Sequence, residues 1–364
     1  MAAARVGPTG RVAGWWLAGM AAVLAVALPL SSRLVEEFYS RLVYRWVQAP
    51  MTSLSNLAPF AVLDALILAA VVGVGLRAVW LLRAARQRGL FAAMLEAFQR
   101  TVRLAGIVVL VFVAAWGCNY RRLPLDATAR GETVAPPSVE ALEAAVQQAA
   151  ATAARQRAAA HAQPDGGMSE VARALEAPMN AALTRLRLPP LGEPGRPKIS
   201  RLLTHWFTWA GVNGMVNPLG LESIVHPALL PFERPFVLAH EWAHLAGHAD
   251  EAEANALGWL ACMHGDAQLR YSANLYLVME GAAALPAGAR TRTIARLDPG
   301  VREDLAAIAH RMQAERPRIR RAASRVYDEY LKANRIEDGT ASYSRALRLI
   351  LSPLLQDAIP GVNR

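Results

Sequence analysis

The stretch LAHEWAHLAGHADEAEAN holds the residues of this chain whose types and spacing are best suited to chemistry. His240, Glu241 and His244 form an H-E-x-x-H sequence, and residues four apart lie on one face of a helix. Both imidazoles can therefore reach one ion, and neutral imidazole is a good zinc ligand. Glu241 lies beside such an ion rather than on it, where a carboxylate can act as general base toward a zinc-bound water. The spacing predicts one Zn²⁺ per chain.

A catalytic zinc takes three protein ligands and keeps one position open, so the histidine pair needs one more partner. Gly247 follows the second histidine by three residues, and glycine favours the left-handed turn that ends a helix. The chain can then double back toward the metal. His248 is a poor third ligand because, on a continued helix, it would lie about 12 Å from His240 along the axis. The remaining candidates are the acids Glu251, Asp250 and Glu253.

These three acids differ in what their spacing offers. Glu251 precedes Asn255 by four residues, so both lie on one helical face and Asn255 can orient a histidine ligand. Asp250 completes an H-E-x-x-H-x-x-G-x-x-D pattern, which has the spacing of metzincins with Asp in the last place. Glu253 lies on the opposite face from Glu251, so a straight helix cannot present both to one ion. We expect Glu251 as the third ligand, with Asp250 and then Glu253 as alternatives.

Three apolar runs come before the motif and predict three transmembrane helices, since a helix needs roughly 20 residues to cross the hydrocarbon core. They cover about residues 12–30, 57–82 and 101–118. The first run has a second interpretation as a cleaved signal sequence. Apolar residues recur at helical spacing from Leu90 to Phe98, which predicts an amphipathic helix on the inner membrane surface. Asp64 is expected near the outer end of the second helix, where it can reach water or a polar partner.

The placement of arginines predicts how these helices are oriented. Arg5 and Arg11 precede the first run, and a second arginine-rich segment lies between the second and third runs. The positive-inside rule puts both segments in the cytoplasm, so the chain after Gly117 lies outside the cytoplasmic (inner) membrane, in the periplasm of a two-membrane bacterium. Because much of the net charge of +10 lies beside apolar runs, we expect the lipid bilayer as a partner and no nucleic acid.

The rest of the chain predicts a linker over residues 119–137 and an outer domain over residues 138–364. Ser138 and Ser169 are placed to cap two helices, the first reaching about residue 162 and the second about residue 187. The stretches KISRLLTHWF and GMVNPLGLESIV have the composition of strands. From Phe236 onward the pattern is helical again. The fold class is therefore mostly α (α+β), with a small sheet just before the candidate metal helix.

Several segments resemble a bacterial family of uncharacterised three-span membrane proteins whose outer domain carries an HExxH motif. The segments are WGCNYRRLPL, HEWAHLAGHADEAEAN, RYSANLYL and VYDEYLKANRIEDGTASYSRALRLIL. The resemblance implies a zincin-type peptidase fold, with His240, His244 and Glu251 as ligands and Glu241 as base. The E-x-x-A-N order is also similar to the E-x-x-A-D of membrane gluzincins, with Asn255 in place of the Asp. The resemblance names no substrate.

These features together predict a membrane-anchored zinc metallopeptidase that cleaves peptides or proteins on the outer side of the membrane. Arg270 and Tyr271 are candidates, by residue type, for contacts to the substrate or the transition state, as are His264 and Tyr343. One alternative is a non-catalytic envelope protein that binds a partner and has a structural or vestigial metal site. Another is a metal-dependent amidase that acts on cell-wall peptides.

Overall fold

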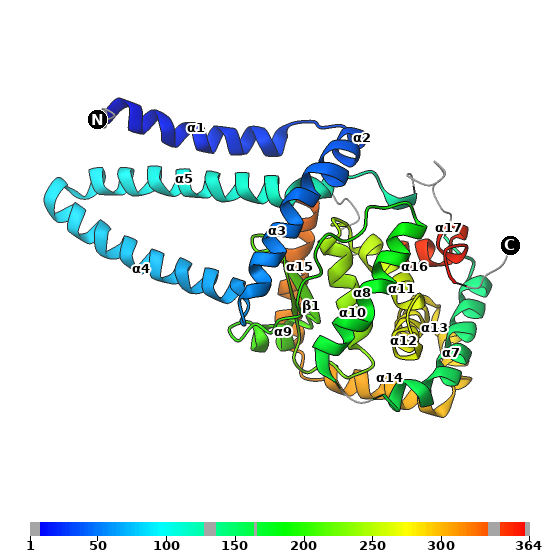
Figure 1. Cartoon of the computed structure of the whole chain (residues 1–364). Helices are drawn as coiled ribbons and strands as arrows, with labels where there is room; N and C mark the ends of the chain where they lie inside the picture. The colour runs from blue at the N-terminus through cyan, green and yellow to red at the C-terminus, as the bar shows by residue number, and fades with distance from the viewer. Residues whose placement is uncertain (1–7, 127–135, 164–165, 334–342, 361–364) are drawn as a thin grey trace.

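Three long apolar helices project from one side of a helical body in the computed structural model (Figure 1). They are α1 (Pro8–Ala27), α4 (Val62–Arg88) and α5 (Leu90–Ala115). By length and apolar composition, α4 and α5 can each cross a membrane, and a third span exists if α1 and the bent helix that follows it count as one. The structure describes residues 8–126, 136–163, 166–333 and 343–360.

The membrane helices differ from the predicted bounds, most clearly where the second and the third begin. The second begins at Val62 rather than at residue 57, because the Glu222 carboxylate accepts hydrogen bonds from the backbone N–H groups of Val62 and Leu63, at 2.8 and 2.7 Å. The prediction of a separate amphipathic helix from Leu90 to Phe98 is wrong. Those residues form the first turns of α5, and Gly89, with φ +86°, makes the whole turn between α4 and α5.

The segment between α1 and α4 is helical, although no helix was predicted there from the sequence. It consists of α2 (Ser32–Leu34), the π-helix η1 (Val35–Val43) and α3 (Tyr44–Leu57). We call residues 32–57 the connecting helix. It is bent by 104° from the last part of α1, so in Figure 1 it runs across the ends of the membrane helices, against the helical body.

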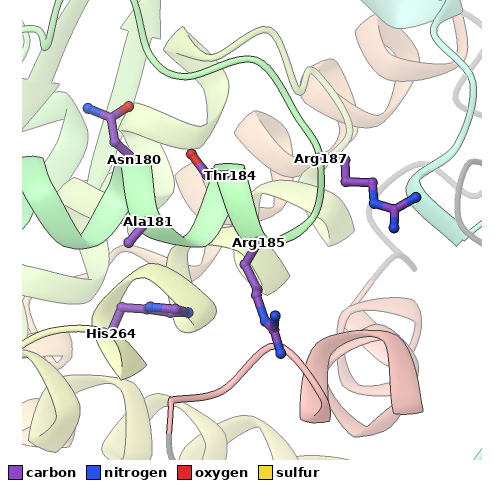
Figure 2. A pocket seen from close by; sticks show the side chains of 6 residues that line it. All are labelled: Asn180, Ala181, Thr184, Arg185, Arg187 and His264. Atoms are coloured by element: carbon purple, nitrogen blue, oxygen red, sulfur yellow. The ribbon is translucent and has the colours of Figure 1, made fainter.

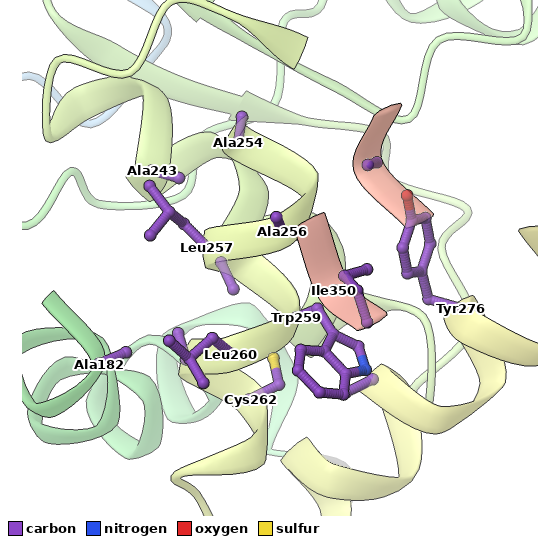
Figure 3. Close-up of a cluster of buried hydrophobic side chains, with 14 of the residues drawn as sticks. Ala182, Ala243, Ala254, Ala256, Leu257, Trp259, Leu260, Cys262, Tyr276 and Ile350 are labelled. Carbon is purple, nitrogen blue, oxygen red and sulfur yellow. The ribbon is translucent and has the colours of Figure 1, made fainter. Parts of the chain in front are cut away.

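The helical body is built around α11 (Glu251–Met263), which is buried along almost its entire length. Figure 3 shows Leu257, Trp259 and Leu260 of this helix packed against side chains from its neighbours. The other helices of the body are α7 (Val139–His161), α8 (Gly167–Arg185), α10 (Arg234–Leu245), α12 (Ala267–Ala284), α13 (Ala287–Ala295), α14 (Pro299–Met312), α15 (Pro317–Ala333), α16 (Tyr343–Leu351) and α17 (Pro353–Gln356).

The predicted caps of the first two helices of the body had different outcomes. The Ser138 side chain accepts a hydrogen bond from the Ala141 backbone N–H and caps α7, as expected. Ser169 is not a cap, because α8 already begins at Gly167. The mostly α fold with a small sheet is confirmed.

The small sheet is a hairpin of two antiparallel strands, β1 (Gly214–Asn217) and β2 (Glu222–Val225). Lys198 forms a bridge to Ile224 on the other side of β2, so β1 lies at the edge. The prediction of a full strand in KISRLLTHWF is wrong, because α9 (Thr204–Ala210) occupies its second half. The buried Phe207 of α9 packs with Ala61, just before α4, so tertiary contacts override a strand-like composition.

Candidate metal centre

The helix α10 presents the H-E-x-x-H residues, and a tight turn at its end reverses the chain. Pro235 lies in the first turn of the helix, where its missing N–H costs no hydrogen bond. At the other end, Gly247 has φ +88°, and its N–H donates to the His244 carbonyl at 2.7 Å. Asp250 then caps α11 by accepting a hydrogen bond from the Glu253 N–H at 3.0 Å. The next residue, Glu251, is the first of α11.

The returning helix α11 crosses α10 at very close range. A Cβ built on Gly258 would lie 2.9 Å from the backbone nitrogen of His240, a distance that real side chains do not adopt. Glycine is therefore required at this crossing by its small size. The contact holds the start of α11 against the histidine-bearing face of α10.

This arrangement brings His240, His244 and Glu251 together, and we call these three residues the metal cluster. Their possible ligand atoms all lie within 4.8 Å of one another. The two Nε2 atoms are 3.1 Å apart, and each is 3.4 Å from a different carboxylate oxygen of Glu251. Tetrahedral zinc with bonds of about 2.0–2.2 Å places neighbouring ligand atoms roughly 3.3 Å apart. The spacing of these donors therefore fits one zinc-sized ion.

Glu241 lies next to the cluster and is buried, with 2% of its surface exposed. Its Oε2 has no hydrogen-bond partner among the described residues, which is a costly state for a buried carboxylate oxygen. The other oxygen faces strand β1, where a Cβ on Gly214 would come within 2.5 Å of it. Burial raises the pKa of Glu241 to about 7. A carboxyl group with that pKa can accept and return a proton near neutral pH.

The protonation of His244 is set by its neighbours. Burial alone lowers its pKa, but the charge of the Glu251 carboxylate beside it raises the pKa to about 9. The same contact acts on Glu251, where burial alone raises the pKa and the two imidazoles hold it well below its usual range. The His244 Nδ1–H donates to the His248 carbonyl at 2.7 Å, which turns Nε2 toward the cluster.

The two alternative acids are engaged elsewhere. Besides capping α11, Asp250 pairs with Arg345 at 2.8 Å. Glu253 accepts a hydrogen bond from the Leu125 backbone N–H at 2.8 Å, and its other oxygen lies 3.0 Å from the His248 imidazole. Of the three acids expected from sequence, Glu251 alone belongs to the group of described residues with metal-ligand spacing.

The structure gives His244 an orienting partner other than Asn255, whose expected role stays a prediction. Asn255 is buried, with 6% of its surface exposed. Among the described residues, however, the backbone carbonyl of His248 supplies the hydrogen bond that orients His244. The helical-face argument missed this partner because a backbone carbonyl in a turn leaves no sign in the sequence.

Two aromatic residues from distant parts of the chain also contact the cluster. The Tyr327 hydroxyl, on α15, donates a short hydrogen bond to Glu251 Oε1. Trp116, the residue directly after α5, places its ring edge-on to His244 with centroids 6.3 Å apart. Sequence reasoning did not single out either residue, although both lie in segments that resemble the three-span family. The centre therefore lies beside the end of a membrane helix.

The residues expected to contact substrate lie away from the cluster. Tyr271 is fully buried, and its hydroxyl donates to Asp304 on α14, while Arg270 is exposed at the start of α12. His264 lines a separate surface pocket of about 590 Å³ at the end of α8 (Figure 2), where its Nε2 lies 2.9 Å from the Ala358 carbonyl. The side chain of Tyr343 lies outside the described part of the structure.

One comparison with known proteins found a match. A family model described as "Protein of unknown function (DUF3810)" matches residues 39–351. A search of curated proteins and a search of solved structures each found no match. The matched range includes α4, α5, the metal cluster and α15.

Proposed function

The chain belongs to the family of proteins of unknown function called DUF3810, and we propose that this member is a membrane-anchored, zinc-dependent metallopeptidase. The observation that carries the proposal is the convergence of two imidazoles and one carboxylate at the spacing of zinc ligands, beside a buried carboxylate with an unpartnered oxygen. A structural zinc site is normally closed by four protein ligands, whereas a catalytic site has three and one open position. The metal cluster offers three ligands, the number of a catalytic site.

In this proposal His240, His244 and Glu251 hold the ion. When bound, the ion supplies Lewis acidity, which polarises a carbonyl group and makes a nearby water more acidic. Glu241 takes the proton of the attacking water on its Oε2 and returns it to the leaving amine, so the carboxylate is regenerated after each cycle.

The strand β1 supports a peptide as the substrate. It lies at the edge of the sheet and meets Glu241 at Gly214, so its outer edge runs beside the candidate base. An extended peptide can add to such an edge through main-chain hydrogen bonds. The cleavable bond would then lie next to the metal cluster.

The location we propose is the outer side of the cytoplasmic membrane. In Figure 1 the helical body lies at the ends of α1 and α5 and at the start of α4, so all of it is on one side of the spans. The arginine-rich segment between the second and third predicted helices lies at the other end. The positive-inside rule assigns that end to the cytoplasm.

The proposal is tested by Glu241→Gln in the full-length protein, with a library of quenched fluorescent peptides as the probe. We expect cleavage to fall by about 10²–10⁴-fold, because a general base contributes that much, while the zinc content stays that of the parent. Equal cleavage by parent and variant would support the non-catalytic alternative. Activity on cell-wall peptides alone would support the amidase.

A further inference from the structure

The connecting helix has the reverse of the polarity that a helix on a soluble domain shows. Its face against the helical body is polar at nearly every turn. The buried residues there include Glu36, Ser40, Tyr44, Gln48, Thr52 and Ser55. A surface helix of a soluble protein instead buries its apolar stripe and exposes its polar one. The polar face is thus turned inward, and the question is what covers the apolar face on the other side of the helix.

The inward polar face is fully used in hydrogen bonds to the body. The Glu36 carboxylate pairs with Arg122 at 2.8 Å, and the Ser40 hydroxyl donates to Asn119 at 3.1 Å. The Tyr44 hydroxyl donates to the carbonyl of Leu245, the last residue of α10, at 3.0 Å. Further along, Gln48 and Thr52 donate to the backbone carbonyls of Glu193 and Leu221. The orientation of the helix on the body is therefore specific.

The outward face carries large apolar side chains in almost every turn. Trp46 and Leu57 each keep 77% of their surface exposed, and Leu54 keeps 70%. The same face continues toward α1 through Leu34, Phe38 and Leu42. Contiguous exposed apolar surface of this length marks a binding surface.

Both ends of the connecting helix lead directly into membrane helices. A short break after Ala27 joins it to α1, and residues 58–61 join it to α4. In Figure 1, the connecting helix lies between the helical body and the region into which α1, α4 and α5 extend. The side chains of α4 are largely exposed and apolar, as lipid-facing residues are. The outward face therefore lies at the level where the spans leave the bilayer.

A second exposed apolar group lies beside the start of α4. Ile199 and Leu202 flank the pair Ser200 and Arg201, which hydrogen-bond to the Asp64 carboxylate in the first turn of α4. Trp206 follows on α9, with 41% of its surface exposed. The hydrogen bonds from Ser200 and Arg201 also show why Asp64 is tolerated in an apolar helix, since its carboxylate has polar partners on the body.

We propose that the outward face of the connecting helix, together with Ile199, Leu202 and Trp206, is embedded in the lipid leaflet next to the helical body. The connecting helix then lies flat in the membrane interface, with its apolar face in the acyl region and its polar face on the body. Arg33 and Arg45, exposed on the same helix, are placed to reach lipid phosphates. Through Tyr44 the helix also fixes α10 at a set height above the bilayer.

Site-directed spin labels on the full chain, in vesicles of phosphatidylethanolamine and phosphatidylglycerol, test this. The labels are placed by Trp46→Cys and Leu54→Cys, with Val72→Cys in the middle of α4 as the lipid control and Arg292→Cys on α13 as the water control. The native Cys118 and Cys262 are buried and burial raises the pKa of each thiol, so they react poorly. Accessibility to oxygen and to a water-soluble nickel chelate is measured at each position.

We expect the labels at positions 46 and 54 to be several-fold less accessible to the nickel chelate than the label at 292, with oxygen access between that at 292 and that at 72. Nickel access equal to that at 292 would overturn the proposal, because the face would then be in water. Low access to both reagents would also overturn it, with dipolar broadening between labels indicating a second copy of the chain as the occupant. The outcome does not depend on metal binding or on peptidase activity.

Discussion

Two groups of histidine, tyrosine and carboxylate side chains lie in this protein, and they are built differently. The metal cluster joins α10 and α11, with Tyr327 beside it. The second group, which we call the Asp304 cluster, joins α7, α12 and α14. In it the Asp304 carboxylate accepts hydrogen bonds from Arg157 and Tyr271, and the His161 Nε2 lies 2.8 Å away.

The difference between the two groups is the source of positive charge. In the Asp304 cluster an arginine neutralises the carboxylate, and the pKa of Asp304 is held below its usual value by Arg157, Tyr271 and His161 against the effect of burial. In the metal cluster, the direct partners of Glu251 among the described residues are two imidazoles and a phenol. The Asp304 cluster therefore has a fixed cation among its own side chains. The metal cluster has none among the described direct partners of Glu251, which supports our proposal that a metal ion supplies the positive charge.

The largest predicted effect separates the clusters by stability. Asp304→Ala leaves Arg157 without its buried partner, which costs about 3 kcal/mol, the low end for such a loss because Arg157 is partly exposed. We expect a melting temperature lower by roughly 5 °C, measured in detergent, with the zinc content unchanged. If the variant lost zinc while keeping its melting temperature, the assignment of the two roles would be reversed.

The next effect concerns the hydrogen bond to the third ligand. Tyr327→Phe removes the donor to Glu251 Oε1, and loss of such a partner typically lowers metal affinity by about 10–100-fold. Tyr330→Phe is the matched control, because the Tyr330 hydroxyl accepts a hydrogen bond from the Tyr120 hydroxyl and its ring stacks in the same aromatic group. Zinc titration against a competing chelator measures both. Equal losses in the two variants would show that the aromatic packing, not the hydrogen bond, is what matters.

The third prediction concerns the pH dependence of the zinc affinity, where a smaller change is expected for each pH unit. Because the pKa of His244 is raised to about 9 in the metal-free protein, its proton must leave before Nε2 can bind a metal. The apparent zinc affinity should therefore be constant above pH 9 and fall by about tenfold for each unit below it. A titration of zinc affinity between pH 6 and pH 10 checks this. An affinity that does not change over that range would mean that no protonated histidine competes with the metal.

The smallest predicted effect concerns the close crossing of α10 and α11. Gly258→Ala forces α11 away from the His240 backbone by several tenths of an ångström, since a Cβ there would lie only 2.9 Å away. We expect weaker zinc binding with retained helicity, by zinc titration and circular dichroism. Gly288→Ala on α13, where a Cβ meets only a flexible arginine at 3.7 Å, is the control. Unchanged binding in Gly258→Ala would show that the crossing tolerates the shift.

The parts of the centre that follow from local sequence could be predicted. The spacing of His240 and His244 depends only on helix geometry, and Gly247 marks the turn because glycine tolerates its φ of +88°. The sequence ranked Glu251 first for its spacing from Asn255, whereas in the structure Asp250 is engaged by its cap to Glu253 and by an ion pair with Arg345, 95 residues away. Tyr327 lies 76 residues from the carboxylate it contacts, so no spacing argument could find it.

The fold shows the same division. Composition and hydropathy predicted a helical domain behind membrane helices, because apolar runs of sufficient length have few other uses. The connecting helix was not predicted, because its polar face is satisfied by backbone carbonyls of Leu221, Glu193 and Leu245 that lie much later in the chain. The role of its apolar face can be inferred only once the direction of the membrane helices is known.

The zinc content of the purified full-length protein, loaded with zinc and then desalted, tests the central claim most directly. We predict about one zinc per chain in the parent, and close to none in His244→Ala and in Glu251→Ala, because each removes one of three ligands. The matched acid control, Glu253→Gln, should keep the parental content. A parent without zinc, or a Glu251→Ala variant that binds as much as the parent, would contradict the account.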